Sequence, residues 1–283
     1  MIVITSGLWL AGSILGIITW AISRRAHLIA RWLLALTLFA LGLIYLALLR
    51  DSAYQIFLLR GTQDVIAWGK WLPLIVGPMV GLLWPLAKGK RKWVLRLELL
   101  LLFAITWLDG GIYQVYGKPP SNPGQEQWLT LQSTSSTCSP AALSALLALY
   151  NVRRTEGELI VDCMTTNRGT PLQGIWRGLV KNCPPGFRPN LRHYPEDISA
   201  RDLELRLPVM INAKLEEQTP ETEIYWRNWG WKPGQPHSVI LYAEDFDGTL
   251  IVGDPSVGVE KWRYEALDVL WDRVALELIP IEK

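Results

Sequence analysis

Apolar positions divide the chain into two parts with different periodicity. The first part holds four long apolar runs separated by short polar loops, at residues 2–22, 32–49, 71–87 and 93–113. At about 1.5 Å of rise per residue, such runs are long enough, or nearly so, to cross about 30 Å of hydrocarbon. The pattern predicts an all-α region of four transmembrane helices over residues 1–117.

Basic residues in the loops predict the orientation of these helices. Eight lie in or beside the first and third loops, namely Arg24, Arg25, Arg31, Lys88, Lys90, Arg91, Lys92 and Arg96, whereas the middle loop holds three. An excess of Lys and Arg marks cytoplasmic loops. An even number of spans then places both termini outside the cytoplasm. Residues 53–68 of the middle loop could form a short interfacial helix or a plain loop.

The second part of the chain changes both its pattern and its charge. Pro and Gly at residues 118–127 are typical of a linker, and a separate domain is expected at 128–283. Helical patterns come first, at 138–151, 155–164 and 170–182. Short apolar runs typical of strands follow at 207–213, 238–243, 249–253 and 275–280. This order predicts an α+β domain with an antiparallel sheet.

Charge patterning argues against nucleic-acid binding. Residues 1–120 carry 12 Lys and Arg against 4 Asp and Glu, whereas residues 121–283 carry 16 against 22, so the total of +2 combines a basic half (+8) with an acidic half (−6). The basic residues lie beside apolar runs instead of forming a stripe on a folded face. No G-x-x-x-x-G-K-[ST] motif is present, so no bound nucleotide is expected.

Cys138 opens the first helical pattern of the second part. Pro140 falls in the first turn, where its missing N–H costs nothing, and Asn151 is a common helix terminator. A cysteine at this position meets unsatisfied backbone N–H groups and the positive end of the helix dipole, which favour the thiolate. Cys138 is therefore a candidate nucleophile.

A thiolate nucleophile needs a base, a group that orients the base, and donors for the oxyanion. His237 precedes the strand at 238–243, and Asp254 lies 17 residues further on, where the next strand ends. In an antiparallel hairpin the start of the first strand lies beside the end of the second, so the two side chains are expected to meet. His193, in a Pro- and Arg-rich stretch without an obvious orienting acid, is the weaker candidate base.

This arrangement resembles the papain-like cysteine peptidases that process bacteriocin leaders, the double-glycine leader peptidase family, over about residues 128–280. The matching residues are Gln132, Cys138, Pro140, His237, Asp254 and Pro255. The resemblance implies helices packed on an antiparallel sheet, no cofactor, and a bacterial membrane. It also implies Cys138 as nucleophile, His237 as general base and acid, Asp254 as the orienting group and Gln132 as oxyanion donor. Ser139 stands where the family usually has glycine.

The remaining cysteines, Cys163 and Cys183, leave two alternatives open. If the domain is extracytoplasmic, a disulfide between them would leave Cys138 as the free thiol. Two buried thiols fit the sequence equally well. No C-x-x-C pair is present, so no metal site is expected.

Three tryptophans precede the candidate base, at Trp226, Trp229 and Trp231. They could form a substrate-binding wall, dock on the lipid interface, or pack in the core under a long loop.

Together these patterns predict an integral membrane cysteine peptidase, or an acyl-transfer relative. It would cut a peptide or protein at the extracytoplasmic face of the bilayer through a thioester intermediate. The alternative is a catalytically idle peptidase-like module that binds a peptide and is coupled to the membrane region. A transporter with a soluble appendage is disfavoured, because paired intramembrane charges are lacking.

Overall fold

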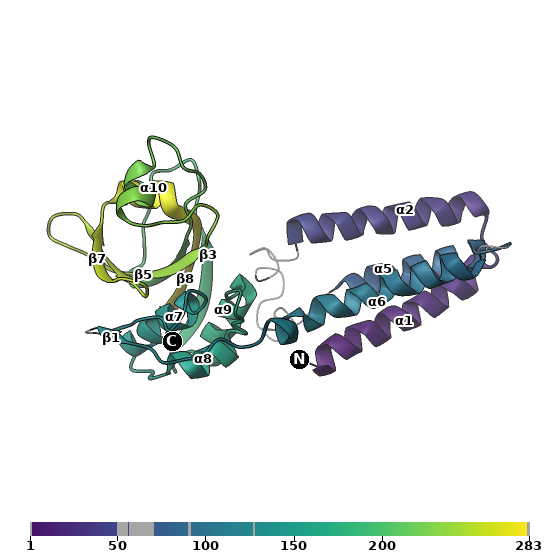
Figure 1. The fold of residues 1–283 in the computed structure, drawn as a ribbon, viewed down its shortest axis with the longest axis horizontal. Coiled ribbons are helices and arrows are strands. Elements are labelled where there is room, and N and C mark those ends of the chain that lie inside the picture. Colours follow the sequence, from purple (N-terminus) through teal and green to yellow (C-terminus); the bar gives the residue numbers. More distant parts are fainter. Residues whose placement is uncertain (1, 50–55, 57–70, 90–91, 127, 282–283) are drawn as a thin grey trace. The chain divides into compact units, whose positions relative to one another are not determined.

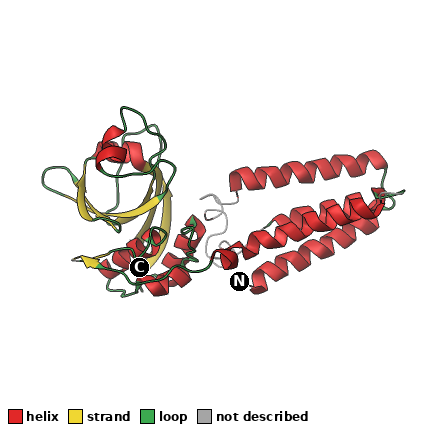
Figure 2. Cartoon of the chain, in the orientation of Figure 1, coloured by secondary structure: helices red, strands yellow, loops and turns green. Residues whose placement is uncertain are grey.

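The computed structural model describes residues 2–49, 56, 71–89, 92–126 and 128–281 (Figure 1). The chain forms two compact units, Met1–Tyr116 and Gly117–Lys283. The first unit is helical, and the second combines helices with antiparallel strands (Figure 2). The prediction of an α+β fold for the second half is therefore confirmed.

The helices of the first unit follow the predicted apolar runs. They are α1 (Ile2–Ser23), α2 (Leu28–Ile44) with the π-helical turn η1 (Tyr45–Leu49), α5 (Leu72–Leu83) with the 3-10 turn η2 (Trp84–Leu86), and α6 (Lys92–Tyr116). Within the described residues, two stretches are long and apolar enough to cross a membrane, Ser6–Ser23 and Leu28–Ala47. The count of four spans stays a prediction. The predicted interfacial segment 53–68 lies, apart from Ile56, outside the described residues.

Large apolar side chains of the first unit face outward. On α1, Leu10, Ile17 and Ile22 keep 61, 64 and 65 % of their surface exposed, and α2 and α6 carry similar residues. Soluble proteins rarely expose contiguous apolar surface of this extent. The outward faces of these helices therefore suit an apolar surrounding medium.

Helices α1 and α5 touch backbone to backbone at two pairs of glycines. A Cβ atom added to Gly77 would lie 2.1 Å from the carbonyl oxygen of Gly12, and one added to Gly81 would lie 2.1 Å from that of Gly16. On each helix the two glycines are four residues apart, Gly12 and Gly16 on α1 and Gly77 and Gly81 on α5, which is the G-x-x-x-G spacing that lets membrane helices approach closely. Thr19 adds a hydrogen bond of 3.1 Å from its Oγ1 to the carbonyl oxygen of Pro78. The α1–α5 contact therefore leaves no room for larger residues.

Replacing Gly81 with leucine should destabilise the first unit, because the new side chain must push α1 away from α5. Overpacking of this kind costs on the order of 1–3 kcal/mol. The unfolding midpoint of the detergent-solubilised protein would fall. Gly7→Leu on α1 is the matched control, since a Cβ at Gly7 meets nothing within 4 Å. Equal midpoints for the two variants would contradict the close contact.

The second unit builds a six-stranded sheet after three helices. The helices are α7 (Cys138–Leu149), α8 (Glu156–Asp162), α9 (Leu172–Lys181) and, later, α10 (Tyr264–Leu270). The strands are β3 (Phe187–His193), β4 (Val209–Ala213), β5 (His237–Glu244), β6 (Leu250–Asp254), β7 (Gly258–Trp262) and β8 (Trp271–Pro280). Their order is β3-β8-β4-β5-β6-β7, with antiparallel neighbours throughout. Strand β7 and helix α10 were not predicted from the sequence pattern.

Shorter elements complete the second unit. They are the hairpin β1 (Gln125–Glu126) and β2 (Leu129–Thr130), and the turns η3 (Ala200–Asp202) and η4 (Ile224–Asn228). The predicted linker 118–127 makes contacts within this unit, because Ser121 donates a 2.8 Å hydrogen bond to the carboxylate of Glu156. Gln125 and Glu126 of this segment form β1.

The sheet separates two layers. Val209, Ile211 and Val239 point into a core that also contains Leu267 and Leu270 of α10. Residues alternate between faces along a strand, so the neighbouring positions of β4 and β5 point toward α7. Figure 1 shows α7, α8 and α9 on one side of the sheet and α10 on the other.

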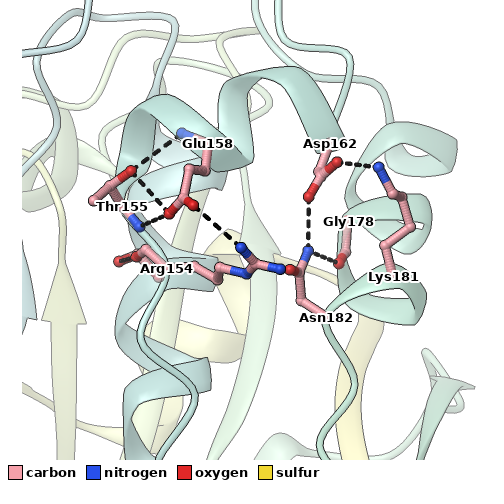
Figure 3. Close-up of polar contacts among 8 residues, drawn as sticks. Arg154, Thr155, Glu158, Asp162, Gly178, Lys181 and Asn182 are labelled. Carbon is pink, nitrogen blue, oxygen red and sulfur yellow. Dashed lines mark hydrogen bonds and ion pairs between the residues drawn. The ribbon is translucent and has the colours of Figure 1, made fainter.

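Polar contacts hold α8 in place at both of its ends (Figure 3). At the start, Thr155 and Glu158 form a reciprocal capping box, which satisfies backbone N–H groups that the helix leaves unpaired. At the end, Asp162 accepts hydrogen bonds from Lys181 and from Asn182, the latter at 3.0 Å. These contacts fix α8 against α9.

Candidate active site

Cys138 is the first residue of α7, as predicted. Its side chain is 9 % exposed. The preceding residue, Thr137, uses its hydroxyl on Thr134 and does not cap the helix. The helix ends at Leu149, and Asn151 follows with a left-handed φ of 60°. The thiol therefore lies at the open, electropositive end of the helix.

The hairpin of β5 and β6 brings His237 to Asp254, as the sequence predicted. Nε2 of His237 lies 2.7 Å from Oδ1 of Asp254. The two strands pair from Glu244 with Leu250 to Ile240 with Gly253, so their open ends carry these two side chains. Asp254 is only 4 % exposed. A buried carboxylate against one ring nitrogen leaves the other nitrogen, Nδ1, to face a reacting group.

Ser256 is a site residue that the sequence reasoning missed. Its backbone N–H and its hydroxyl donate hydrogen bonds of 2.7 and 2.6 Å to Oδ1 of Asp254. Together with His237 these donors outweigh the effect of burial and lower the pKa of Asp254. The Asp-Pro-Ser order was a usable signal, because an Asp carboxylate commonly accepts a hydrogen bond from the backbone N–H two residues later in the sequence.

Cys138 and His237 shift each other's pKa in opposite directions. Burial raises the pKa of the Cys138 thiol, but the hydrogen bond and the positive charge of His237, with the Ser238 backbone N–H, lower it below its ordinary value. Burial lowers the pKa of His237, but its hydrogen bonds to Asp254 and Cys138 raise it above its ordinary value. The pair therefore favours thiolate and imidazolium over a neutral thiol and a neutral imidazole.

These shifts predict the pH dependence of cleavage. As pH falls through the lowered pKa of Cys138, the thiolate is protonated and attack stops. As pH rises through the raised pKa of His237, the proton for the leaving group is lost. Cleavage should therefore follow a bell-shaped curve of rate against pH. The midpoint of its acid limb should lie below the ordinary thiol pKa of 9.0, and the midpoint of its alkaline limb above the ordinary imidazole pKa of 6.5. A single rise centred near pH 9 in kcat/KM would contradict the ion pair.

Gln132 lies on the same side of the site as Asp254. Its backbone N–H donates a 2.8 Å hydrogen bond to the carbonyl oxygen of Pro255. The next residue, Ser133, donates its backbone N–H to the buried carboxylate of Glu156 at 2.8 Å. These two contacts hold in place the loop that precedes α7 in the sequence. The Oε1 atom of Gln132 is buried and lacks a hydrogen-bond partner within the described structure.

Two cavities lie beside the Cys138–His237 pair. The first, of about 160 Å³, is lined by Gln132, Trp229, Trp231 and the pair of His237 and Asp254, among others. The second, of about 240 Å³, is lined by Cys138 and Ser139, the turn at residues 167–170, and Asn212. His237 borders both. An extended peptide could therefore pass across the cysteine from one cavity to the other.

The three tryptophans have different surroundings. Trp229 and Trp231 line the first cavity, and the ring of Trp231 lies 5.7 Å from that of His237, edge to face. Trp226 does not line it. Its ring packs on the sheet core, and its Nε1 donates to the carbonyl oxygen of Thr219 at 3.4 Å. Trp229 and Trp231 also pack against this core, so packing alone does not distinguish the three. The substrate-binding role of Trp226 stays a prediction, without the cavity contact that the other two make.

Cys163 and Cys183 are free thiols in the structure, so the predicted disulfide alternative is corrected. Cys163 is fully buried beside Gly178 of α9, where burial raises its pKa. Cys183 instead donates to the carbonyl oxygen of Phe187 at 3.2 Å. Each thiol packs in its own local environment.

His193, the weaker candidate base, lies away from His237 and Asp254 in the sheet order. His193 is exposed on the edge strand β3, separated from β5 by β8 and β4. Within the described residues, no three His, Cys, Asp or Glu side chains are grouped to hold a metal ion.

No protein-family model matches the chain, and no curated protein matches it. Similar solved structures include the peptidase domain of Streptococcus ComA, a bi-functional ABC transporter involved in a quorum-sensing pathway. It is 22 % identical, with a TM-score of 0.41, over 54 % of this chain and 98 % of that one. Another is a double glycine motif protease from an AMS/PCAT transporter in complex with the leader peptide. It is 17 % identical, with a TM-score of 0.40, over 58 % of this chain and 95 % of that one. Both of these solved structures are peptidases by name.

Proposed function

We propose that the chain is a membrane-anchored cysteine peptidase that cuts a peptide or protein at the extracytoplasmic face of the membrane. One observation carries the proposal. Cys138, at the start of α7, meets His237, whose other ring nitrogen lies 2.7 Å from the buried carboxylate of Asp254. A nucleophile, a base and an orienting acid in this order have the geometry of covalent catalysis.

The reaction follows from these positions. The Cys138 thiolate attacks the carbonyl carbon of the scissile bond, and the oxyanion accepts hydrogen bonds from the Gln132 side chain and the Cys138 backbone N–H. His237 donates its proton to the leaving amine, which departs and leaves a thioester. His237 then takes a proton from water, the hydroxide adds to the thioester, and the thiolate leaves. An amine in place of water would give acyl transfer. Asp254 holds the ring of His237 throughout.

The proposal places residues 1–117 in the bilayer as four spans, with the linker 118–127 and the peptidase domain 128–283 outside the cytoplasm. It is supported by the outward apolar faces of α1, α2 and α6. It is also supported by the basic residues beside the first and third loops. A reporter that works only in the cytoplasm, fused after Lys283, should be inactive. An active fusion would overturn this orientation.

The peptidase proposal is tested by incubating the full-length protein in nanodiscs with a mixed peptide library and identifying new termini by mass spectrometry. We expect cleavage by the untreated protein and none after alkylation of Cys138 with iodoacetamide. Peptides that bind both forms equally, without new termini, would instead favour an idle peptide-binding module.

A further inference from the structure

A short chain of hydrogen bonds lies directly beneath the Cys138–His237 pair. The hydroxyls of Ser139 and Ser238 are 2.8 Å apart, and the Ser238 hydroxyl donates to Oδ1 of Asn212 at 2.9 Å. Ser139 follows Cys138 in the sequence, and Ser238 follows His237. The two serines are 4 % and 2 % exposed. These hydrogen bonds therefore link the residue that follows the nucleophile to the residue that follows the base.

The direction of these hydrogen bonds can be read from the far end. The Asn212 side chain presents its oxygen to Ser238, which leaves its amide nitrogen for Asp272, whose pKa a hydrogen bond from Asn212 lowers against the larger effect of burial. An amide oxygen only accepts, so Ser238 donates to it. The single proton of Ser238 is then used, so Ser238 accepts from Ser139 at their 2.8 Å contact. The Ser139 hydroxyl also lies 4.0 Å from the Cys138 sulfur. Ser139 thus donates to Ser238, and Ser238 donates to the side-chain oxygen of Asn212.

The four residues come from four elements. Asn212 and Ser238 are paired positions on β4 and β5, so their side chains share the sheet face that points toward α7. Asp272 is the second residue of β8. It lies next to the place where the β4–β8 pairing is irregular, between Ile211 and Ala213. The arrangement thus crosses three neighbouring strands and ends in the first turn of α7.

We propose that Ser139, Ser238 and Asn212 are positioning residues that set the Cys138–His237 distance, with Asp272 fixing the orientation of the Asn212 amide. This inference rests on the proposed peptidase function. Helix α7 and strand β5 are 99 residues apart at this contact, so no local chain geometry joins them. The Ser238 backbone N–H also donates to the Cys138 sulfur. A shift of Ser238 would therefore move the base and remove a donor from the thiolate together.

The test measures the alkylation rate of Cys138 by iodoacetamide across pH in the full-length protein, followed by mass spectrometry of the Cys138 peptide. Ser238→Ala should move the inflection upward by about one pH unit, which lowers the thiolate fraction about tenfold on the acid side. Ser139→Ala should move it at least as far, because it also removes the 4.0 Å contact of that hydroxyl with the Cys138 sulfur. Ser139→Thr retains the hydroxyl and should restore most of the wild-type profile.

Ser144→Ala is the matched control on the same helix. Ser144 is also buried and donates to the carbonyl oxygen of Arg154 at 2.6 Å, so its loss costs a comparable hydrogen bond away from the pair. Its alkylation profile should match that of wild type. An equal shift in Ser144→Ala would mean that the profile reports general loosening of α7 and would overturn the proposal.

A reciprocal exchange tests the orientation of the Asn212 amide. Asn212→Asp still accepts from Ser238 but cannot donate to Asp272, so two carboxylates face each other and the alkylation inflection should rise. Adding Asp272→Asn supplies the missing donor from the other side and should return the inflection to the wild-type position. A double variant no better than Asn212→Asp would contradict the role given to Asp272.

The two proposals fail in different ways. If Cys138 of the wild-type protein alkylates no faster at pH 7 than an ordinary thiol, the Cys138–His237 ion pair is absent and the peptidase proposal fails. Wild-type protein with the shifted profile, together with unshifted Ser139→Ala and Ser238→Ala variants, would overturn only the positioning role.

Discussion

Cleavage of peptides should disappear in the Cys138→Ala variant, with a loss of about 10⁴-fold or more in kcat. The reason is that alanine leaves no atom that can form the thioester, while the rest of the cleft stays in place. The side chain is 9 % exposed and small, so its removal should cost little stability. Cleavage is measured on the purified full-length protein by the appearance of new termini.

Cys183→Ala is the control for this variant. Cys183 is a half-buried thiol whose pKa is raised by burial, and it lies two residues after the end of α9 instead of in the site. It should keep wild-type cleavage. Processing that persists unchanged in Cys138→Ala and is lost in Cys183→Ala would reverse the assignment of the nucleophile.

Replacing His237 with alanine should lower kcat by about 10³-fold, since general acid and base catalysis contributes about 10²–10⁴-fold. The same change should alter the alkylation profile of Cys138. Without the imidazolium, burial is left to dominate, so the pKa of the Cys138 thiol should rise above its wild-type position. Iodoacetamide alkylation at pH 6 to 7 should slow in parallel with cleavage.

His193→Ala provides the comparison, because His193 is exposed on β3 and distant in the sheet order from β5. It should leave both the cleavage rate and the alkylation profile unchanged. If His237→Ala slows cleavage but leaves the alkylation profile of Cys138 in place, the base would not be paired with the thiol in the free protein.

Local features of the site were readable from the sequence. Pro140 and Asn151 bracket the helix that begins at Cys138, and both act through backbone preferences within a few residues. The pairing of His237 with Asp254 was readable for a similar reason. A tight turn between two short strands sets which residues lie opposite one another, so the ends of the hairpin are determined over 17 residues of chain.

Other features depended on packing between distant elements. Cys138 and His237 meet only because α7 packs on the face of β5, and complementarity between two surfaces is not encoded in the periodicity of either. The same holds for the tryptophans. Trp226, Trp229 and Trp231 share one short stretch and all pack against the sheet core, yet only the last two line the cavity.

The sequence by itself therefore determined the apolar helices, the α+β class, the helix start at Cys138 and the hairpin that joins His237 to Asp254. These features follow from short-range periodicity, capping and turn chemistry. Only the tertiary structure decided the contact of α7 with β5, the separate environments of Cys163 and Cys183, and the hydrogen bonds from Ser139 through Ser238 to Asn212. Those contacts join residues that are far apart in the chain, and they form only when whole elements pack together.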